Sequence, residues 1–297
     1  MAEKRGQGEI FHFAISTSHL TIKMVVMKNF AGQHPIGSVR TGTRPEHPVF
    51  KRGFLNLGHR GVPNLAPENT LAGFRLAHQQ HATGIELDVR VCKSGELVVI
   101  HDARVNRTTT GRGFVRARTL QQLRLLDAGI RFGEKFRGQR IPTLEQVFTE
   151  LPADFVLNIE IKGHPRVLTG VDEQLLHIIH KHDAMGRVII SSFNPIILRR
   201  LRRRDTRIAT GFLVDRTFFI KRSEKAILKW TGFNAIHLDA ALATPRFISR
   251  LREMGLHCIV WGDLSLNKIQ TLLSLDIDGL ITDFPDVIHF FLNRERL

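Results

Sequence analysis

Acidic side chains alternate with apolar ones in two segments of the sequence. Glu86 and Asp88 lie within "GIELDVRV" at 84–91, and Glu160 lies within "VLNIEIK" at 156–162. Successive side chains of a β-strand point to opposite faces, so Glu86 and Asp88 share one face. Three carboxylates gathered on such a face would form an oxygen-rich site for Mg²⁺ or Ca²⁺, whereas Zn²⁺ more often takes His or Cys ligands. The same alternation also fits a strand with one solvated, salt-bridged face.

A histidine ends the apolar segment that follows the first of these strands. The segments 84–91 and 97–101 are separated by five residues, too few for a crossover helix, so we expect an antiparallel hairpin. With Ser94-Gly95 as a two-residue turn, the register places Asp88 directly opposite His101. This histidine and the two acidic side chains then lie on the same side of the hairpin.

Basic and imidazole groups occur where other strands end. His59 and Arg60 close the apolar segment that begins at residue 54, and Lys162 follows Glu160 by two positions. Guanidinium and ammonium groups bind phosphate, and imidazoles transfer protons near neutral pH. Two other groups of polar residues are interpreted structurally: Asn69 and Thr70 as helix-capping residues, and His237 as a core histidine with its hydrogen bonds satisfied.

The elements that must position these groups recur with a regular rhythm. Short segments rich in apolar and β-branched residues begin near positions 54, 84, 97, 155, 187, 207, 234, 256 and 278, and helix-like stretches separate most of them. Strands that alternate with helices predict a parallel sheet. Without the hairpin's second strand, eight parallel strands remain over about 240 residues, near the ~250 of a (β/α)₈ TIM barrel. The stretch 103–141 is predicted to be a small insertion after the hairpin.

Charge and composition limit the choice of partners. Lys and Arg number 43 against 28 Asp and Glu, a formal charge of +15, so an anionic ligand is expected. The run "RRLRRRDTR" at 199–207 is interpreted as a largely solvated helix rather than a specific binding patch. Signatures of zinc fingers, homeodomains and RNA-recognition domains are absent, so no specific nucleic-acid partner is predicted. Peripheral contact with an anionic membrane is compatible with the charge.

The first residues differ from the rest of the chain. Residues 1–50 show little hydrophobic periodicity and are predicted to form a basic, flexible extension before a barrel domain over 51–297. The chain has two cysteines and no apolar run near the ~20 residues of a membrane span. We therefore expect a cytoplasmic protein, and the sequence predicts no oligomeric state.

Several motifs together resemble the glycerophosphodiester phosphodiesterases. The match runs in the family's order over about residues 54–290. Its motifs are "GHRG" with "PENT" at 58–70, "IELDVRVCKSGELVVIHD" at 85–102, "RTTTGRG" at 107–113, "IPTLEQVF" at 141–148, "IEIK" at 159–162, "SSFNP" at 191–195 and "DGLITDFPD" at 278–286. The resemblance implies a TIM barrel with a small insertion, in agreement with the pattern of elements.

The resemblance also implies roles for individual residues. Glu86, Asp88 and Glu160 would bind one divalent cation, either Mg²⁺ or Ca²⁺. His59 and His101 would be the catalytic acid–base pair, Arg60 and Lys162 would hold the phosphate, and Phe193 and Trp261 would line the glycerol side. One departure occurs after the tryptophan, where the family often has Thr and this sequence has Gly262.

The expected activity is metal-dependent hydrolysis of a small-molecule glycerophosphodiester to sn-glycerol 3-phosphate and an alcohol. The attacking oxygen is either the substrate's own 2-hydroxyl, which would give a cyclic phosphate, or water, and either histidine can be the acid. A lysophospholipase D acting on membrane lysophospholipids is the alternative. A non-catalytic, anion-binding barrel protein is a further alternative from another class, and it would not need the two histidines.

Overall fold

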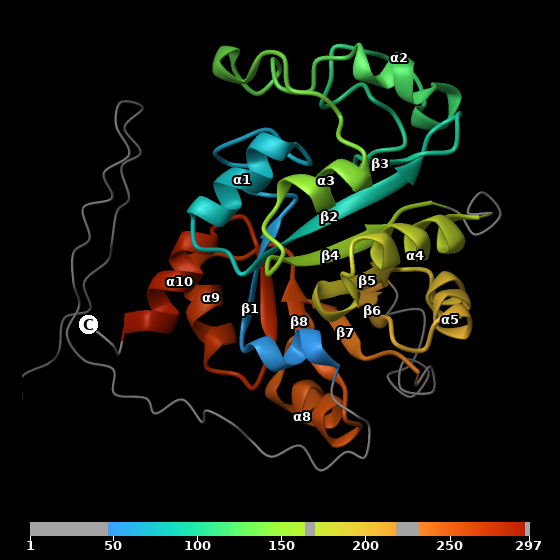
Figure 1. The fold of residues 1–297 in the computed structure, drawn as a ribbon. Coiled ribbons are helices and arrows are strands. Elements are labelled where there is room, and N and C mark those ends of the chain that lie inside the picture. The colour runs from blue at the N-terminus through green and yellow to red at the C-terminus, as the bar shows by residue number, and fades with distance from the viewer. Residues whose placement is uncertain (1–46, 164–169, 218–231, 295–297) are drawn as a thin grey trace, which may run out of the picture. The chain divides into compact units, whose positions relative to one another are not determined.

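A closed sheet forms the centre of the computed structural model, which describes residues 47–163, 170–217 and 232–294. Eight strands run parallel and the pairing of β1 with β2 closes them into a barrel, whereas β3 pairs with β2 in the antiparallel direction (Figure 1). The strands are β1 Leu55–His59, β2 Gly84–Val91, β3 Leu97–Val99, β4 Val156–Ile161, β5 Val188–Ser192, β6 Ala209–Val214, β7 Ala235–Asp239, β8 His257–Trp261 and β9 Gly279–Thr282. The predicted (β/α)₈ barrel is therefore confirmed.

The register of the strands shows which side chains point inward. Following the paired residues once around the eight parallel strands from Leu57 returns to a position eight residues earlier in the chain, the displacement typical of this fold. The lower interior is apolar and includes Leu57, Val156, Ile189, Ala235 and Ile259. Residues two or four positions further along the same strands point inward as well, nearer the carboxyl-terminal mouth.

Helices surround the barrel and begin at the predicted kinds of capping residue. Thr70 caps α1, where its hydroxyl accepts a hydrogen bond from Gly73 N at 3.2 Å, and Thr143 with Gln146 forms a capping box on α3. The helices that follow or precede the strands are α1 Leu71–Gln79, α3 Leu144–Glu150, α4 Val171–Lys181, α5 Pro195–Arg204, α8 Pro245–Glu253, α9 Leu266–Leu273 and α10 Pro285–Asn293. None of the helices within the described residues is long and apolar enough to cross a membrane.

The register predicted for the hairpin is wrong by one residue. The turn contains three residues, Lys93 to Gly95, because Cys92 pairs with Glu96 and Gly95 adopts a φ of +104°. The amide of Ile100, rather than that of His101, therefore pairs with the carbonyl of Asp88 at 2.9 Å. The physical reason is that a glycine in the left-handed region permits the extra turn residue.

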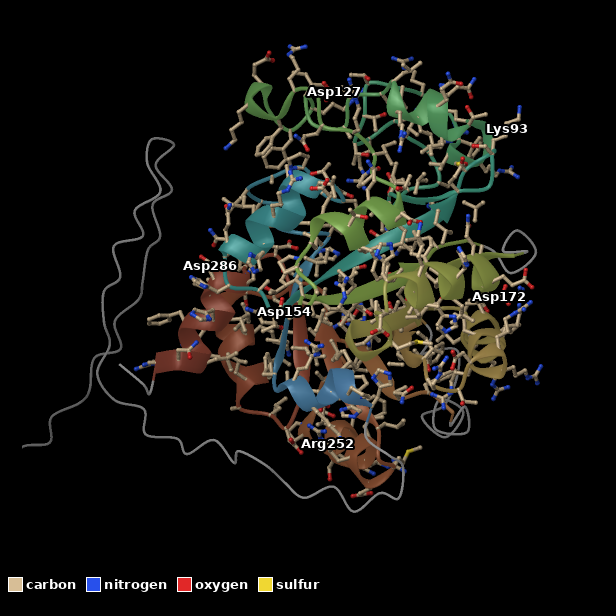
Figure 2. The ribbon with its side chains drawn as sticks, viewed as in Figure 1. Lys93, Asp127, Asp154, Asp172, Arg252 and Asp286 are labelled. Carbon is tan, nitrogen blue, oxygen red and sulfur yellow. The ribbon has the colours of Figure 1, made fainter. Side chains whose placement is uncertain are left out.

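The insertion has a small core of its own beyond the end of the hairpin. It contains η2 Val115–Ala117, α2 Leu120–Arg124 and η3 Glu134–Phe136, and it packs Val105, Val115, Leu123 and Ile141 against Val98 and Ile100 of the hairpin. Asp127, labelled in Figure 2, holds its loops by accepting backbone hydrogen bonds from Gly129, Ile130 and Gly138 at 2.7–2.9 Å. The insertion lies over the far end of β2 and β3 in Figure 1.

A short segment before β1 closes the amino-terminal end of the barrel. In η1 Pro48–Arg52, Val49 and Phe50 are buried against the apolar interior residues, and the Phe50 ring stacks on His257 with 3.7 Å between centroids. The final residues of the predicted extension are thus packed. Residues 1–46 lie outside the described residues, so the extension itself stays a prediction.

Residues 199–204 of the arginine run lie on α5, as expected, but some of them make specific contacts. Arg200 and Arg204 both pair with Asp172 of α4, which is labelled in Figure 2, and this carboxylate has no exposed surface. Arg202 donates a hydrogen bond to Asn234 Oδ1 at 2.6 Å. The run therefore joins neighbouring barrel elements in addition to contributing exposed charge.

Gly84 provides a test of the barrel's close packing. A Cβ at this position would lie 2.4 Å from the carbonyl oxygen of Val156 and 2.7 Å from its Cβ, so the backbone of β4 would have to move. We expect Gly84→Ala to destabilise the protein by about 1–3 kcal/mol, with each kcal/mol lowering Tm by about 2–4 °C. Gly133→Ala is the control, because no atom lies within 4 Å of its added Cβ. Equal melting temperatures for the two variants would contradict the packing described.

Candidate active site

The three predicted metal-binding carboxylates lie together inside the carboxyl-terminal end of the barrel. Asp88 on β2 and Glu160 on β4 are directly paired positions, and Glu86 is paired with His59 of β1. One oxygen of each carboxylate lies within 4.8 Å of the other two, and all three residues are buried. The shared face that the alternation predicted is therefore an interior face and not a solvated one.

The two predicted phosphate-binding cations lie against these carboxylates. Lys162 Nζ lies 2.6 Å from Glu160 Oε1 and 3.1 Å from Asp88 Oδ1, and Arg60 Nε lies 3.3 Å from Asp88 Oδ2. Both side chains are partly exposed, at 15% and 19%. Each cation therefore joins the buried negative charge to the open mouth of the barrel.

The loop after β1 holds the cluster through backbone groups as well as side chains. The amide of Arg60, whose φ is +51°, donates to Glu86 Oε2 at 3.1 Å. Asn69, also in the left-handed region, donates from Nδ2 to Asp88 Oδ2 at 2.8 Å and accepts from the Asp88 amide at 3.2 Å. The interpretation of Thr70 as a cap is confirmed, but Asn69 positions Asp88 instead. Its residue type fits both roles, so the sequence alone could not separate them.

His59, the first predicted acid–base residue, has a carboxylate partner from the other end of the chain. Its Nδ1 lies 2.8 Å from Asp283 Oδ1, just after β9. Burial acts to lower the pKa of His59, but the hydrogen bond to Asp283 and the charge of Glu86 outweigh it and raise that pKa. Asp283 belongs to the motif "DGLITDFPD", which was the available signal, but its contact with His59 was not predicted.

His101, the second predicted acid–base residue, lies where the chain bends after β3. Its Nδ1 lies 2.8 Å from Asp102 Oδ1, and its carbonyl accepts a hydrogen bond from Arg90 Nε at 2.8 Å. Burial lowers the pKa of His101 and is only partly offset by the charge of Asp88 and the hydrogen bond with Asp102. The charge of Asp88 therefore affects the pKa of His101, although the two residues are not paired as the predicted register required. Arg90 fixes its backbone.

The predicted aromatic residues form one wall of the barrel mouth. Phe193 and Trp261 pack edge to face with 5.6 Å between ring centroids, and Lys162 Nζ lies 6.0 Å from the Phe193 ring. Trp261 Nε1 donates to the carbonyl of His237 at 2.9 Å, which fixes the indole. Phe193 therefore adjoins Lys162, and Trp261 lies beside Phe193, on the side of β5 and β8.

Gly262 extends this side of the mouth. Its φ is +120°, a conformation that residues with a Cβ rarely adopt, and an added Cβ would lie 3.8 Å from Asp239 Oδ1. Asp239, Arg216, Asp263 and Lys268 line a cavity of about 620 Å³ here. The glycine that departs from the family's pattern is thus required by the backbone and leaves the region near Asp239 open.

His237 is a core histidine, as predicted, but its hydrogen bonds differ from the prediction. The residue is fully buried in the barrel, and burial lowers the pKa of His237 to about 3, so the ring is neutral. Neither ring nitrogen has a hydrogen-bond partner among the described residues, so the expectation of satisfied hydrogen bonds is wrong. Room for the ring comes from Gly211, where a Cβ would lie 2.2 Å from His237 Nε2.

The carboxylate cluster fits a hard divalent cation. Burial, with the charge of Asp88, raises the pKa of Glu86 to about 8, and burial raises that of Glu160 to about 7, so the ionised form of each carboxylate is disfavoured without further positive charge nearby. Three buried carboxylates supply oxygen ligands of the kind that Mg²⁺ and Ca²⁺ prefer. No Cys or His belongs to the metal-type cluster found among the described residues.

A (β/α)₈ barrel whose mouth combines buried carboxylates, fixed cations and histidines paired with aspartates defines a hydrolytic enzyme acting on an anion. The family model "Glycerophosphoryl diester phosphodiesterase family" matches residues 59–287. The chain belongs to this family and is a phosphoric diester hydrolase. The non-catalytic alternative is thereby overturned.

Relatives of known name and structure resemble the chain over most of its length. A glycerophosphodiester phosphodiesterase of Caldanaerobacter subterraneus subsp. tengcongensis is 39% identical over 240 residues, covering 79% of this chain and 96% of that protein. An Oleispira antarctica phosphodiesterase, solved in complex with the product sn-glycerol-3-phosphate, is 26% identical with a TM-score of 0.73, covering 80% and 96% of the two chains. A glycerophosphodiester phosphodiesterase from Agrobacterium tumefaciens is also 26% identical, with a TM-score of 0.68 and coverage of 78% and 97%.

The raised pKa of Glu86 predicts how the metal-free protein responds to pH. Because its pKa is higher folded than unfolded, folding favours the protonated form, and stability is lost as pH rises from about 4.5 toward about 8. Glu86→Gln, which removes this charge, should raise Tm in EDTA by a margin that grows between pH 6 and pH 8. Each kcal/mol corresponds to about 2–4 °C.

The exposed Glu134 provides the control for this measurement. It lies on the insertion and pairs with Arg137, so Glu134→Gln should give a difference from the unsubstituted protein that does not grow over the same pH range. A Glu86→Gln difference that stays constant or shrinks toward pH 8 would show that the carboxylate is already neutralised by its neighbours.

Proposed function

We propose that this enzyme hydrolyses glycerophosphodiesters to sn-glycerol 3-phosphate and an alcohol, with His59 and His101 as its acid–base pair. The observation that carries the proposal is that both histidines have an aspartate on Nδ1, at 2.8 Å in each case. That contact leaves Nε2 of each ring for exchange of a proton with a ligand. The solved Oleispira antarctica relative, in complex with sn-glycerol-3-phosphate, supports the choice of product.

The chain's own residues have separate tasks in this reaction. Arg60 and Lys162 bind the phosphate oxygens and offset the charge that develops there as the phosphorus–oxygen bond to the alcohol breaks. One histidine accepts the proton of the attacking oxygen and the other donates a proton to the departing alcohol, so the overall proton count is unchanged. The attacking oxygen belongs to water or to the substrate's 2-hydroxyl; in the second case water then opens the cyclic phosphate.

Glu86, Asp88 and Glu160 would hold one divalent cation, either Mg²⁺ or Ca²⁺. When bound, the cation would supply positive charge that offsets charge on the phosphate and favours loss of the proton from the attacking oxygen. Asn69 and the Arg60 amide keep two of these carboxylates in place through the hydrogen bonds described above. Phe193 and Trp261 would contact the glycerol carbon atoms, since they form the apolar wall beside Lys162.

The two histidines provide the direct test of catalysis. We expect His59→Ala and His101→Ala each to reduce kcat on glycerophosphocholine or glycerophosphoethanolamine by about 10²- to 10⁴-fold, because each removes a proton-transfer group. His177→Ala, an exposed histidine on α4, should retain activity. Full turnover by either active-site variant would rule out the acid–base assignment.

Metal dependence and substrate class can be measured together. Activity should disappear in EDTA and return with Mg²⁺ or Ca²⁺, and Glu160→Gln should lose activity at all metal concentrations that saturate the unsubstituted enzyme. Each condition is assayed on glycerophosphocholine and on a lysophospholipid. Faster turnover of the lysophospholipid would instead favour a lysophospholipase D that contacts membranes, and activity indifferent to both chelation and Glu160→Gln would contradict the metal site.

A further inference from the structure

Arg107, in the insertion, is bound to two carboxylates from different loops at once. Its Nη1 and Nη2 lie 2.5 and 2.9 Å from the two carboxylate oxygens of Glu68. Its Nε and Nη2 lie 2.8 and 3.1 Å from the two oxygens of Asp102. All the carboxylate oxygens of both partners are therefore held by one planar guanidinium, a geometry that an ammonium group cannot reproduce.

Each of these carboxylates also holds a residue of the active site. Asp102 contacts Nδ1 of His101 at 2.8 Å, and Glu68 accepts a hydrogen bond from Arg60 Nη1 at 3.1 Å. Arg107 therefore completes a continuous chain of contacts between a histidine and a phosphate-binding cation. We propose that Arg107 is a positioning residue that fixes His101 and Arg60 relative to each other. This inference rests on the proposed function.

The charges along this chain alternate, which keeps both carboxylates ionised. The hydrogen bond from Arg107 is the main cause that holds the pKa of Asp102 well below its ordinary value. Burial acts to raise the pKa of Glu68, but Arg107 and Arg60 outweigh it and lower that pKa. Both carboxylates thus stay acceptors at neutral pH, so the imidazole and the guanidinium keep the same partners.

The backbone around Arg107 is held by the insertion. Thr109, fully buried, donates from its hydroxyl to Val105 O at 2.7 Å and accepts from the Gly111 amide at 3.0 Å. Val105 packs in the small core of the insertion, and an isolated bridge joins Arg104 to Phe114 next to it. The insertion therefore does more than cover the hairpin: it holds Arg107 against two active-site loops.

Arg107→Met and Arg107→Lys separate positioning from simple structural support. We expect Arg107→Met to lower kcat and raise KM on glycerophosphocholine, with kcat/KM falling by about 10- to 100-fold, because both ends of the chain lose their anchor. In the pH profile of kcat/KM, the limb that reports the pKa of His101 should move to higher pH. The reason is that the charge of Asp102 is then no longer offset by the Arg107 guanidinium. Arg107→Lys keeps the positive charge but cannot make the paired hydrogen bonds of the planar guanidinium. This variant should therefore lose activity while that limb of the pH profile stays at the same pH.

Arg137→Met is the matched control. Arg137 also lies in the insertion and also pairs with a glutamate, Glu134, through two hydrogen bonds of 2.5 and 2.7 Å, but it is exposed and away from the two loops. If Arg107→Met behaves like Arg137→Met in kcat, KM and pH profile, the inference is wrong. A loss of Tm in Arg107→Met with an unmoved pH limb would likewise reduce Arg107 to structural support.

Asp102→Asn and Glu68→Gln keep the inference testable if the Arg107→Met variant does not fold. Asp102→Asn should mainly lower kcat and Glu68→Gln should mainly raise KM, because they act on the histidine and the phosphate-binding arginine respectively. If the two variants changed kcat and KM identically, the inference that Asp102 acts on His101 and Glu68 acts on Arg60 would be contradicted. Failure of the proposed function is distinguishable, because it would appear as full turnover in His59→Ala and His101→Ala.

Discussion

Three carboxylates that are buried side by side repel one another and lose their hydration. The arrangement of the other residues at the barrel mouth depends on offsetting this unfavourable free energy. Unpaired buried charge is strongly unfavourable, so each carboxylate must have a cation or a hydrogen-bond donor within reach. Lys162 and Arg60 approach Asp88 from just beyond the ends of β4 and β1, and Asn69 and the Arg60 amide donate the remaining hydrogen bonds to Asp88 and Glu86. The left-handed backbone at Arg60 and Asn69 is thus tied to the need to deliver donors to buried oxygens.

The cations that hold the carboxylates are held in turn by anions further out. Arg60 contacts Glu68, Glu68 contacts Arg107, and Arg107 contacts Asp102 beside His101. Each ion pair restrains the orientation of the next, so geometry at the centre depends on residues of β2, of the loop after β1 and of the insertion. A network of this kind rigidifies a site only when its members are satisfied.

The inner face of the strands was predictable, because side chains alternate between the two faces of a strand whichever strands pair with it. Glu86, Asp88, Glu160 and Lys162 could therefore be grouped from spacing, and the barrel followed from the count of strands. The register of the hairpin could not be predicted in this way. A two-residue turn and a three-residue turn both suit "CKSGE", and the choice depends on the conformation of Gly95. The contacts of His59 with Asp283, and of Arg107 with Glu68, join segments too far apart in sequence for spacing to reveal.

The charge of the whole chain and the charge of the site have opposite signs. The formal charge of +15 suggested that anions bind because the protein is basic. At the mouth, however, the contacts described above bring together six carboxylates and four cationic side chains, which leaves an excess of two negative charges when all six carboxylates are ionised and the histidines are neutral. The carboxylates are Glu68, Glu86, Asp88, Asp102, Glu160 and Asp283, and the cations are Arg60, Arg90, Arg107 and Lys162. A phosphodiester would be repelled by this excess, and one divalent cation would cancel it. The local balance, rather than the net charge, is therefore the physical reason to expect a metal where the substrate binds.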